Sequence, residues 1–424
     1  MAYCMTPLFI NTTDLAGGAA RAAYRLFKGV RSSGLDARML VRDKTSNDVN
    51  IVTPAKNMKC LTERIKPHIE RLPFRLYPHR KKTAFHFQWN PGVSPSVIQK
   101  INPDIIHLHW ICGGFLRIES LPKLKRPIVW TLHDMWAFTG GCNYSADCNS
   151  YEKSCGHCPQ LASSKGDDLS RWVWRRKKRS WAGMPLAIVA PSRWLAECAG
   201  RSSLFHDKQT KVIPNGIDTD IFRPCEKKRA RERFNLPQDK TLILFSAANG
   251  IRNPLKGFDY LRHALNNLKM RMIAKTPELV IMGNSTSERI EDVEVPVHNI
   301  GHLTDEHDIA LLYSAADLFA APSVQDNLPN TVMEAFACGT PCVAFRIGGL
   351  PDMIEHQENG YLAEPFDAED LAHGIAWSLE NQGRRHRLSS RATEKVISEF
   401  AVGLISKRYM ALYEELCSYN TSLI

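Results

Sequence analysis

The stretch Ser323-Val-Gln-Asp-Asn-Leu-Pro-Asn-Thr-Val-Met-Glu334 decides the fold, and it continues through Ala-Phe-Ala-Cys-Gly-Thr-Pro-Cys-Val-Ala-Phe345 to a pair of glycines. The apolar residues before it read as a short buried strand, so the segment predicts strand, loop, helix and strand. Pro329 fits the first helical turn, where its missing N–H costs nothing, and Gly339 fits just past the helix end. The pattern predicts an α/β fold.

Two acidic residues of this segment indicate a ligand site. Asp326 is expected in the loop at the carboxyl end of a strand, where open α/β sheets bind ligands, and Glu334 within the helix that follows. The start of that helix offers backbone N–H groups and a partial positive charge to a phosphate. A carboxylate inside the helix can accept two hydrogen bonds from a diol such as a ribose. The segment suits a phosphorylated sugar or a nucleotide, and the alternative is a solvated loop Asp with a helix-surface Glu.

A family resemblance follows from these residues. Asp326, seven intervening residues and Glu334, then Ala-Cys-Gly-Thr-Pro-Cys-Val-Ala and Gly348-Gly349, resemble the Glu-x7-Glu region of retaining glycosyltransferases of family 4. The resemblance covers nearly the whole chain and implies the GT-B fold, in which two doubly wound α/β domains face across a cleft. The first acidic position departs from the family, because Asp replaces Glu. The shorter side chain withdraws the carboxylate by about 1.5 Å, which affects the donor sugar more than the reaction.

The resemblance also implies how the chain is divided. Residues 1–222 are expected to form an N-terminal, Rossmann-like, acceptor-binding domain. Residues 223–399 are expected to form a C-terminal, Rossmann-like domain that binds the nucleotide sugar. Residues 400–424 are expected to form a last helix that packs back on the N-terminal domain.

The donor site is expected in the C-terminal domain. Lys256, beside Gly257, can hold a diphosphate as a point charge, and Arg252 can add bidentate contacts. A surface loop cation is the alternative reading of Lys256. By resemblance, Glu334 binds the ribose and Asp326 binds the sugar. The expected donor-binding set is completed at the helix start by Asn327, Leu328, Pro329 and Asn330.

The reaction is expected to need no catalytic metal. Lys256 and the helix N–H groups can stabilise the leaving diphosphate as the glycosidic bond breaks. The expected donor is a UDP or GDP sugar. Neither the Gly-x-Gly-x-x-Gly pattern nor the Gly-x4-Gly-Lys-Ser/Thr pattern occurs near the N-terminus, which argues against a dinucleotide dehydrogenase or a P-loop enzyme.

Two predicted parallel strands in the first half of the chain, 104–110 and 127–134, end in His and Asp residues. A strand-end His is often only structural. However, Thr-Leu-His-Asp-Met-Trp resembles the family motif whose His contacts the donor sugar near the reacting carbon. We therefore expect His133 to act with Asp326 and Lys256 as a catalytic residue. Further loops are expected at the cleft, at Asp134, Gly17, Gly18, Asn215 and Gly216, although a glycine pair alone is equally a tight turn.

Four cysteines lie in the polar loop 140–160, at Cys142, Cys148, Cys155 and Cys158. Structural Zn²⁺ on four thiolates would order this loop and leave no open position for catalysis. An iron–sulfur cluster and free thiols remain alternatives. The Trp-Thr-Leu-His-Asp-x-Trp string followed by spaced cysteines also resembles a subgroup that includes colanic-acid and other exopolysaccharide transferases. This resemblance implies a lipid-linked saccharide acceptor in cell-envelope biosynthesis.

The chain of 424 residues has a net charge of +11, which favours anionic partners. No run of eighteen apolar residues and no signal peptide is evident, so we expect a cytoplasmic protein. The segments 60–85 and 171–181 mix basic with apolar or aromatic residues and suit an anionic membrane surface. A solvated basic face is the alternative for the first segment, and nucleic acid or a helix with buried Trp for the second. With a lipid-linked acceptor, we expect peripheral association with the inner face of the membrane and no nucleic acid.

The resemblance thus implies a retaining hexosyltransferase that moves a sugar from a nucleotide sugar to an acceptor hydroxyl near His133. One alternative is a basic, zinc-containing protein that binds nucleic acid, which leaves residues 326–349 unexplained. The other is a non-catalytic binder of sugar nucleotides, for which Asp326 is the hint.

Overall fold

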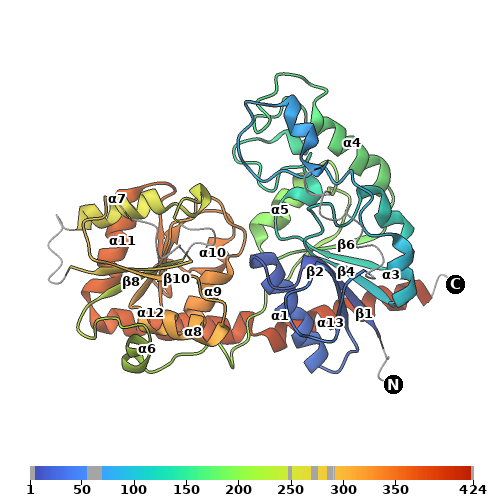
Figure 1. Cartoon of the computed structure of the whole chain (residues 1–424). Helices are drawn as coiled ribbons and strands as arrows, with labels where there is room; N and C mark the ends of the chain where they lie inside the picture. The colour runs from blue at the N-terminus through green and yellow to red at the C-terminus, as the bar shows by residue number, and fades with distance from the viewer. Residues whose placement is uncertain are drawn as a thin grey trace. The chain divides into compact units, whose positions relative to one another are not determined.

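The computed structural model describes residues 5–54, 69–246, 251–268, 276–283, 290 and 292–421 (Figure 1). Residues 419–421 are described by their backbone only. The chain forms two compact units. Unit 1 comprises the chain up to Pro214 together with the chain from Ser406 onward, and unit 2 runs from Asn215 to Ile405.

The chain passes from unit 1 to unit 2 after Pro214 and returns to unit 1 after Ile405. The boundaries expected from the sequence were instead after residues 222 and 399. Residues 215–222 join unit 2 because they pair with the segment that precedes the last helix. Ile217 N–H donates to Phe400 O at 2.9 Å, and Val402 N–H donates to Ile217 O at 2.8 Å. These two bonds tie the start of unit 2 to its end.

Unit 1 is built on a seven-stranded sheet in the order β3-β2-β1-β4-β5-β6-β7, with every neighbouring pair parallel. The order reverses between β1 and β4, which makes this the switch point where open α/β sheets bind ligands. The strands are β1 (Pro7–Thr13), β2 (Arg38–Asp43), β3 (Ile51–Val52), β4 (Ile105–Leu108), β5 (Ile128–Thr131), β6 (Leu186–Ala190) and β7 (Thr210–Val212).

Unit 2 repeats this plan with a six-stranded parallel sheet in the order β10-β9-β8-β11-β12-β13. Its switch point lies between β8 and β11. The strands are β8 (Leu242–Ser246), β9 (Glu278–Met282), β10 (Val297–Gly301), β11 (Leu318–Ala321), β12 (Cys342–Phe345) and β13 (Gly360–Ala363). The expected pair of doubly wound α/β domains is confirmed.

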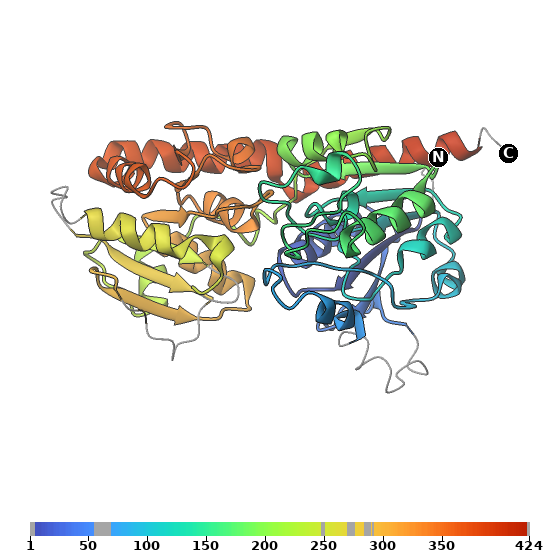
Figure 2. The same ribbon diagram turned by 90° about the horizontal axis from the view of Figure 1, so that it is seen from above.

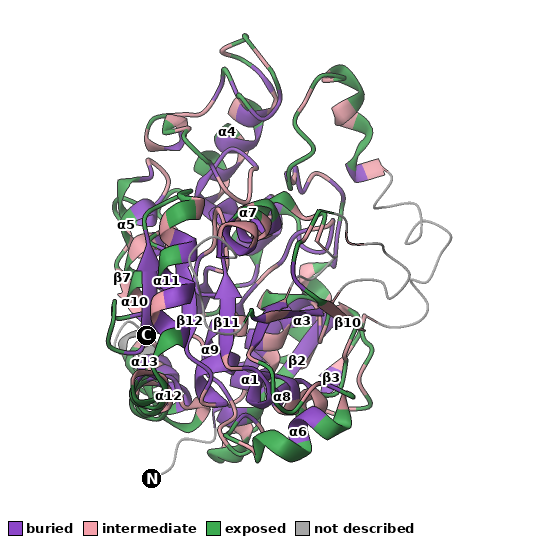
Figure 3. Ribbon diagram, turned by 90° about the vertical axis from the view of Figure 1, so that its left-hand side faces the viewer, coloured by how far each residue is buried: buried purple, intermediate pink, exposed green. Residues whose placement is uncertain are grey.

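Helices cover both faces of the unit 2 sheet, and this explains its apolar strands. Leu242 and Leu244 pack in one apolar cluster with residues of α8 and α9, while Ile243 and Phe245 pack in another with residues of α7 and α11. Strands buried on both faces read as continuous apolar runs, as β11 and β12 show in Figure 3. The unit 2 helices are α6 (Lys227–Arg233), η6 (Pro254–Lys256), α7 (Phe258–Leu268), α8 (Glu306–Ala315), α9 (Asn330–Ala337), α10 (Leu350–Met353), α11 (Ala368–Glu380), α12 (Gln382–Lys395) and the π-helical turn η8 (Val396–Phe400).

Three of the unit 1 helices, α3, α4 and α5, begin at polar capping residues. Ser94, Asp168 and Ser192 each accept backbone N–H groups of the first turn that follows, which stabilises a helix start. No helix in the described part of the chain is both long and apolar enough to cross a bilayer. The unit 1 helices are α1 (Gly18–Ser32), η2 (Leu72–Leu76), α3 (Pro95–Ile101), η3 (Ile118–Lys123), η4 (Trp136–Phe138), η5 (Ser150–Glu152), α4 (Leu169–Trp181) and α5 (Arg193–Arg201).

Helix α13 (Val402–Thr421) begins in unit 2 and continues into unit 1. It runs beside β7 (Figure 2), where Arg408 Nη2 donates to Val212 O at 2.8 Å. On its inner face, the Tyr413 hydroxyl lies 2.6 Å from His107 Nδ1, and the Tyr409 hydroxyl lies 2.8 Å from Thr131 Oγ1. The C-terminal helix is therefore anchored to β4 and β5 by buried hydroxyl contacts.

Candidate active site

Three loops of unit 2 meet at the carboxyl ends of β8, β11 and β12, around the switch point. Two glycines with left-handed backbone make the approach possible. A Cβ on Gly257 (φ 67°) would lie 1.9 Å from Pro322 O, and a Cβ on Gly348 (φ 52°) would lie 2.0 Å from Asp326 O. Any larger residue at either position would push the loops apart.

Lys256 and Asp326 form an ion pair where these loops meet. Lys256 Nζ lies 2.7 Å from Asp326 Oδ2, and both side chains are partly buried, with 25% and 14% of their surface exposed. Ser323 Oγ donates to the same carboxylate oxygen at 3.3 Å, and the Asn327 N–H donates to Asp326 Oδ1 at 3.1 Å. The lysine and the carboxylate predicted from sequence are thus brought together at the edge where ligands bind.

Glu334 lies within α9, as expected, but it is buried rather than on the helix surface. Only 3% of the residue is exposed, and its Oε2 accepts a hydrogen bond from the Tyr313 hydroxyl at 3.2 Å. The surface alternative is therefore wrong for this residue. A buried carboxylate held by a hydroxyl has a fixed orientation, which suits recognition of a diol.

The start of α9 is organised by the segment that opens unit 2. Asn215 Nδ2 lies 3.5 Å from Leu328 O and 3.4 Å from Asn330 Oδ1. Pro329 occupies the position before the first helical residue, and Asn327 is buried with 4% exposed. Arg252, which belongs to the same predicted donor-binding set, is exposed in the loop before η6.

Asn215 and Gly216 were expected in the N-terminal domain, and the structure places both in unit 2. A Cβ on Gly216 would lie 3.0 Å from the Val402 Cα, so this glycine serves close packing against the first turn of α13. Asn215 instead supports the start of α9. Neither role was visible in the sequence, because both depend on contacts with distant residues.

In unit 1 the loops after β4 and β5 bring two histidines together. His109 Nδ1 lies 2.9 Å from His133 Nε2, and the two rings stack with centroids 5.2 Å apart. Burial lowers the pKa of His133 to about 4 and lowers that of His109 well below its ordinary value. Both imidazoles are therefore neutral at physiological pH. Sequence reasoning selected His133 and missed His109, although the His107-Leu-His109 spacing at a strand end was a signal for it.

Asp134 has a structural role in the loop after β5. Its Oδ1 accepts the Trp136 N–H at 2.8 Å, and its Oδ2 accepts Asn143 Nδ2 at 2.6 Å. Burial raises its pKa to about 6, against the opposing effect of the Trp136 hydrogen bond. Gly17 has a φ of 93° and precedes α1, so its left-handed backbone turns the chain into that helix, which Gly18 begins.

Lys177 is the central residue of the cysteine-rich part of unit 1. It is fully buried, its Nζ donates to Trp136 O and to Thr139 O, and it lies 3.7 Å from the Trp136 ring centroid. Burial lowers its pKa to about 7, and the nearby Cys112, Cys142, Cys155 and Asp134 oppose that shift. Sequence reasoning missed Lys177, because it counted as one of several surface cations.

The four cysteines of loop 140–160 are unpaired thiols. Burial raises the pKa of Cys142, and Cys155, Cys158 and Cys148 add to that effect, so the thiols lie within electrostatic range of one another. Within the described ranges, however, no group of three or more His, Cys, Asp or Glu side chains is arranged to hold a metal ion. As they stand, these residues do not fit a closed four-thiolate centre.

The expectation that residues 171–181 face a membrane is wrong for the buried half of this segment. Trp174 and Trp181 are 7% and 3% exposed, and Trp181 Nε1 donates to Ile118 O at 3.0 Å. Arg176 pairs with Glu119 at 2.6 Å. Since residues 174, 177 and 181 share one face of α4, that face enters the core and only Trp172 is substantially exposed among the three tryptophans of the segment.

The other basic segment, 60–85, is described from residue 69 onward; residues 60–68 lie outside the described residues. Its η2 turn exposes two large apolar side chains, Leu72 at 42% and Leu76 at 74%. Arg71 and Arg75 beside them are exposed as well. The described part of the segment is thus an exposed apolar and basic surface.

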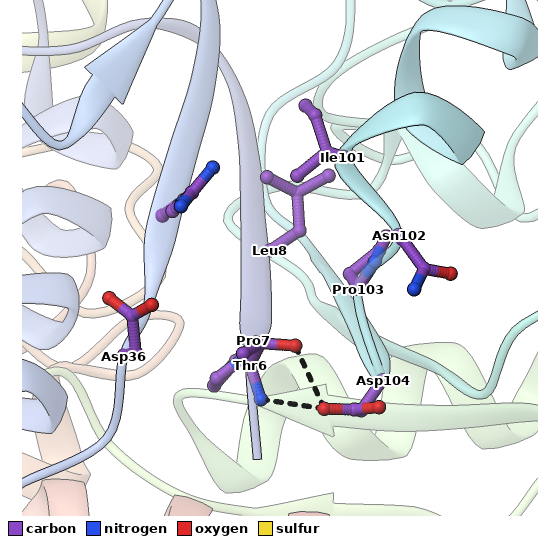
Figure 4. Close-up of a pocket in the computed structure, with 9 residues that line it drawn as sticks. Thr6, Pro7, Leu8, Asp36, Ile101, Asn102, Pro103 and Asp104 are labelled. Carbon is purple, nitrogen blue, oxygen red and sulfur yellow. Dashed lines mark hydrogen bonds between the residues drawn. The ribbon is translucent and has the colours of Figure 1, made fainter. Parts of the chain in front are cut away.

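A pocket of about 330 Å³ lies at the opposite edge of the unit 1 sheet, by the amino ends of β1, β2 and β4 (Figure 4). Asp104 Oδ2 there accepts both the Thr6 N–H and the Thr6 hydroxyl at 2.8 Å. No residue predicted from sequence to bind substrate lines it. The pocket is therefore separate from the candidate site.

Comparison with known proteins agrees with this geometry. Residues 226–395 match the family model for glycosyl transferases group 1, and residues 16–221 match the model for glycosyltransferase family 4. The D-inositol 3-phosphate glycosyltransferase of Xylanimonas cellulosilytica is 32% identical over 91% of this chain and 89% of that protein.

Two solved structures share the fold over nearly the whole chain. Sucrose-phosphate synthase from Thermosynechococcus elongatus has a TM-score of 0.69 at 20% identity and covers 98% of this chain and 100% of its own. HepE of Anabaena, solved with UDP-glucose, has a TM-score of 0.61 at 18% identity and covers 99% and 100%. The GT-B fold is confirmed, and the chain belongs to the group 1 glycosyl transferases.

Proposed function

We propose that this glycosyltransferase moves a hexose from a nucleotide sugar, bound at the carboxyl edge of the unit 2 sheet, to an acceptor hydroxyl on the side of unit 1. The observation that carries the proposal is the Lys256–Asp326 ion pair at the switch point between β8 and β11. A cation at this edge, beside a helix start, suits a diphosphate. The solved HepE complex supports a UDP sugar as donor.

We propose the following donor contacts. Lys256 meets the diphosphate, with Arg252 at the outer end of the same loop. Glu334, fixed by Tyr313, accepts the ribose hydroxyls. Asp326 receives the sugar and is joined by the loop residues Asn327, Leu328, Pro329 and Asn330.

The transfer needs no redox step. The acceptor oxygen forms the new bond to the anomeric carbon, the bond from that carbon to the diphosphate oxygen breaks, and the acceptor proton leaves with the diphosphate. Negative charge grows on the leaving oxygen, where Lys256 and the backbone N–H groups at the start of α9 stabilise it. We propose retention of anomeric configuration and place the sugar near His133.

We propose a lipid-linked saccharide as acceptor. We also propose that the exposed residues 71, 72, 75 and 76, the η2 surface, contact the membrane that holds this acceptor. Leu72 and Leu76 offer apolar side chains, and Arg71 and Arg75 offer charge to anionic headgroups. The relative named for D-inositol 3-phosphate supports a second candidate, a phosphorylated polyol. These acceptors differ in whether transfer requires a lipid.

The test combines a donor panel with two acceptors. Purified protein is incubated with UDP-, GDP- and ADP-sugars, with a lipid-linked saccharide or an inositol phosphate, and products are measured by mass spectrometry. Proton NMR of the new glycosidic bond reports its configuration. Transfer from one donor to the lipid-linked acceptor, with the donor's configuration kept, is the expected result. Transfer only to the inositol phosphate overturns the lipid-linked acceptor, and donor binding without any transfer overturns the enzymatic proposal.

A further inference from the structure

We infer that His109 is a positioning residue that fixes the tautomer of His133, so that His133 carries its proton on Nδ1 and meets the substrate as a neutral hydrogen-bond donor. The inference rests on the proposed function, because it takes His133 to lie at the sugar. It adds a residue and a proton position to that proposal.

The contact between the two rings is compatible with two placements of the shared hydrogen. His109 Nδ1 and His133 Nε2 are 2.9 Å apart, so one of these nitrogens donates and the other accepts. If His109 donates, its Nε2 is a bare lone pair. If His133 donates, His109 Nε2 carries the hydrogen.

The surroundings of His109 Nε2 favour the first arrangement. This atom is buried and has no hydrogen-bond partner among the residues that the structure describes. A buried N–H without an acceptor is rarer in folded proteins than an acceptor without a donor. His109 therefore donates through Nδ1, and His133 Nε2 accepts. His133 then bears its hydrogen on Nδ1.

Packing fixes the orientation of the His109 ring, so that its Nδ1 stays directed at His133. Its ring centroid lies 5.7 Å from that of Phe9, with 12° between the ring planes, and 4.2 Å from that of His107, with 33° between the planes. Trp130 Nε1 donates to His109 O at 3.1 Å, which holds the backbone. His107 is itself fixed, since its two nitrogens contact the Thr131 and Tyr413 hydroxyls at 2.7 and 2.6 Å.

The consequence is a defined role for His133. Its Nε2 is occupied by His109, and burial keeps both rings neutral. His133 therefore does not remove the acceptor proton, and it donates through Nδ1–H to a hydroxyl oxygen of the bound sugar. The proton of the acceptor leaves with the diphosphate, as proposed above.

The direct test is the tautomer of His133, measured by nitrogen-15 NMR on the full-length protein labelled at histidine and assigned by comparison with His133→Gln. We expect a protonated Nδ1 and an unprotonated Nε2. His109→Leu should release the ring to the Nε2–H form. His109→Asn, whose amide can donate from the position of Nδ1, should restore the Nδ1–H form. Tyr413→Phe, which removes only the hydroxyl that contacts His107, should leave the tautomer of His133 unchanged.

Kinetics give a second readout. We expect His109→Leu to lower kcat by about tenfold or more, as displaced substrate contacts do, with His109→Asn close to wild type and both variants folded by circular dichroism. An Nε2–H tautomer of His133 in the wild type overturns the inference, as does an unchanged tautomer in His109→Leu. If the tautomer behaves as expected and no donor supports transfer, the proposed function fails while the positioning of His133 stands.

Discussion

Lys256 Nζ and Asp326 Oδ2 lie 2.7 Å apart and join the loop after β8 to the loop after β11, across the point where the strand order of unit 2 reverses. Seventy residues separate the two in sequence. Because Asp326 also accepts from Ser323 and Asn327, the carboxylate is held in place before any donor arrives. The pair presets the position of the cation that the proposed mechanism needs.

Replacing Glu334 by Gln should remove discrimination between ribose and 2′-deoxyribose. A hydrogen bond from a sugar hydroxyl to a carboxylate contributes about 1.5–3 kcal/mol, so wild-type protein should bind UDP about tenfold or more tightly than 2′-deoxy-UDP. Isothermal titration calorimetry with both nucleotides checks this. Tyr313→Phe should lower the melting temperature and keep the preference for ribose. Equal binding of the two nucleotides by wild type would remove Glu334 from the ribose site.

Glu119 should contribute stability that disappears in acid. Burial opposes its ionisation, but the hydrogen bonds and charge of Arg176 outweigh burial and lower its pKa from 4.5 to about 2. Since the folded pKa is the lower one, the contribution is complete above 4.5 and is lost as pH falls toward 2. Glu119→Gln should therefore lower the melting temperature near pH 7 and much less near pH 3. Asp167→Asn, which breaks an exposed pair with Arg175, should change little at either pH. A pH-independent effect of Glu119→Gln would contradict the assignment.

The cysteine loop makes a prediction about metal content. The sequence predicts structural Zn²⁺ in this loop, and binding must draw the four thiols together, because the residues that the structure describes are not arranged around an ion. Metal analysis of purified protein should then find about one zinc per chain, lost in the double variant Cys155→Ser and Cys158→Ser and kept in Cys198→Ser. Protein without metal that melts at the same temperature with and without added zinc would show that the loop holds free thiols.

The η2 surface should bind anionic membranes. The double variant Leu72→Ser and Leu76→Ser should bind vesicles containing anionic lipid about tenfold or more weakly in a sedimentation assay. The reason is that each leucine buries apolar area on insertion. Ile397→Ser removes a similarly exposed apolar residue of unit 2, at 60%, and should have no effect. Binding that is equal for neutral and anionic vesicles, or for both variants, would contradict a membrane role for this surface.

The fold could be predicted because its signals are local, and so could the positions of Asp326 and Glu334 relative to the strand and the helix. Apolar runs bounded by Gly and Pro mark buried parallel strands, and Asp326 and Glu334 lie in one strand–loop–helix segment. Lys256 and Asp326 were both expected at the donor site of the second domain, but their direct ion pair was not predicted.

The remaining features depend on long-range packing. The burial of Lys177 was missed in a segment crowded with cations, and a helix with buried Trp was only an alternative there, although Lys177 and Trp181 are spaced to share one helical face. The His109–His133 contact joins two strands and needed the strand order. Asn215 belongs to unit 2 through hydrogen bonds to residues more than a hundred positions away.

The central claim is that Lys256 binds the donor diphosphate, and calorimetric binding of the preferred nucleotide sugar to Lys256→Ala tests it most directly. Losing one charge-assisted contact of about 1.5–3 kcal/mol should weaken binding about 10- to 150-fold. Lys240→Ala, which removes an exposed lysine at the opposite end of β8, should bind as wild type does. Equal affinity of wild type and Lys256→Ala for the donor would contradict the account.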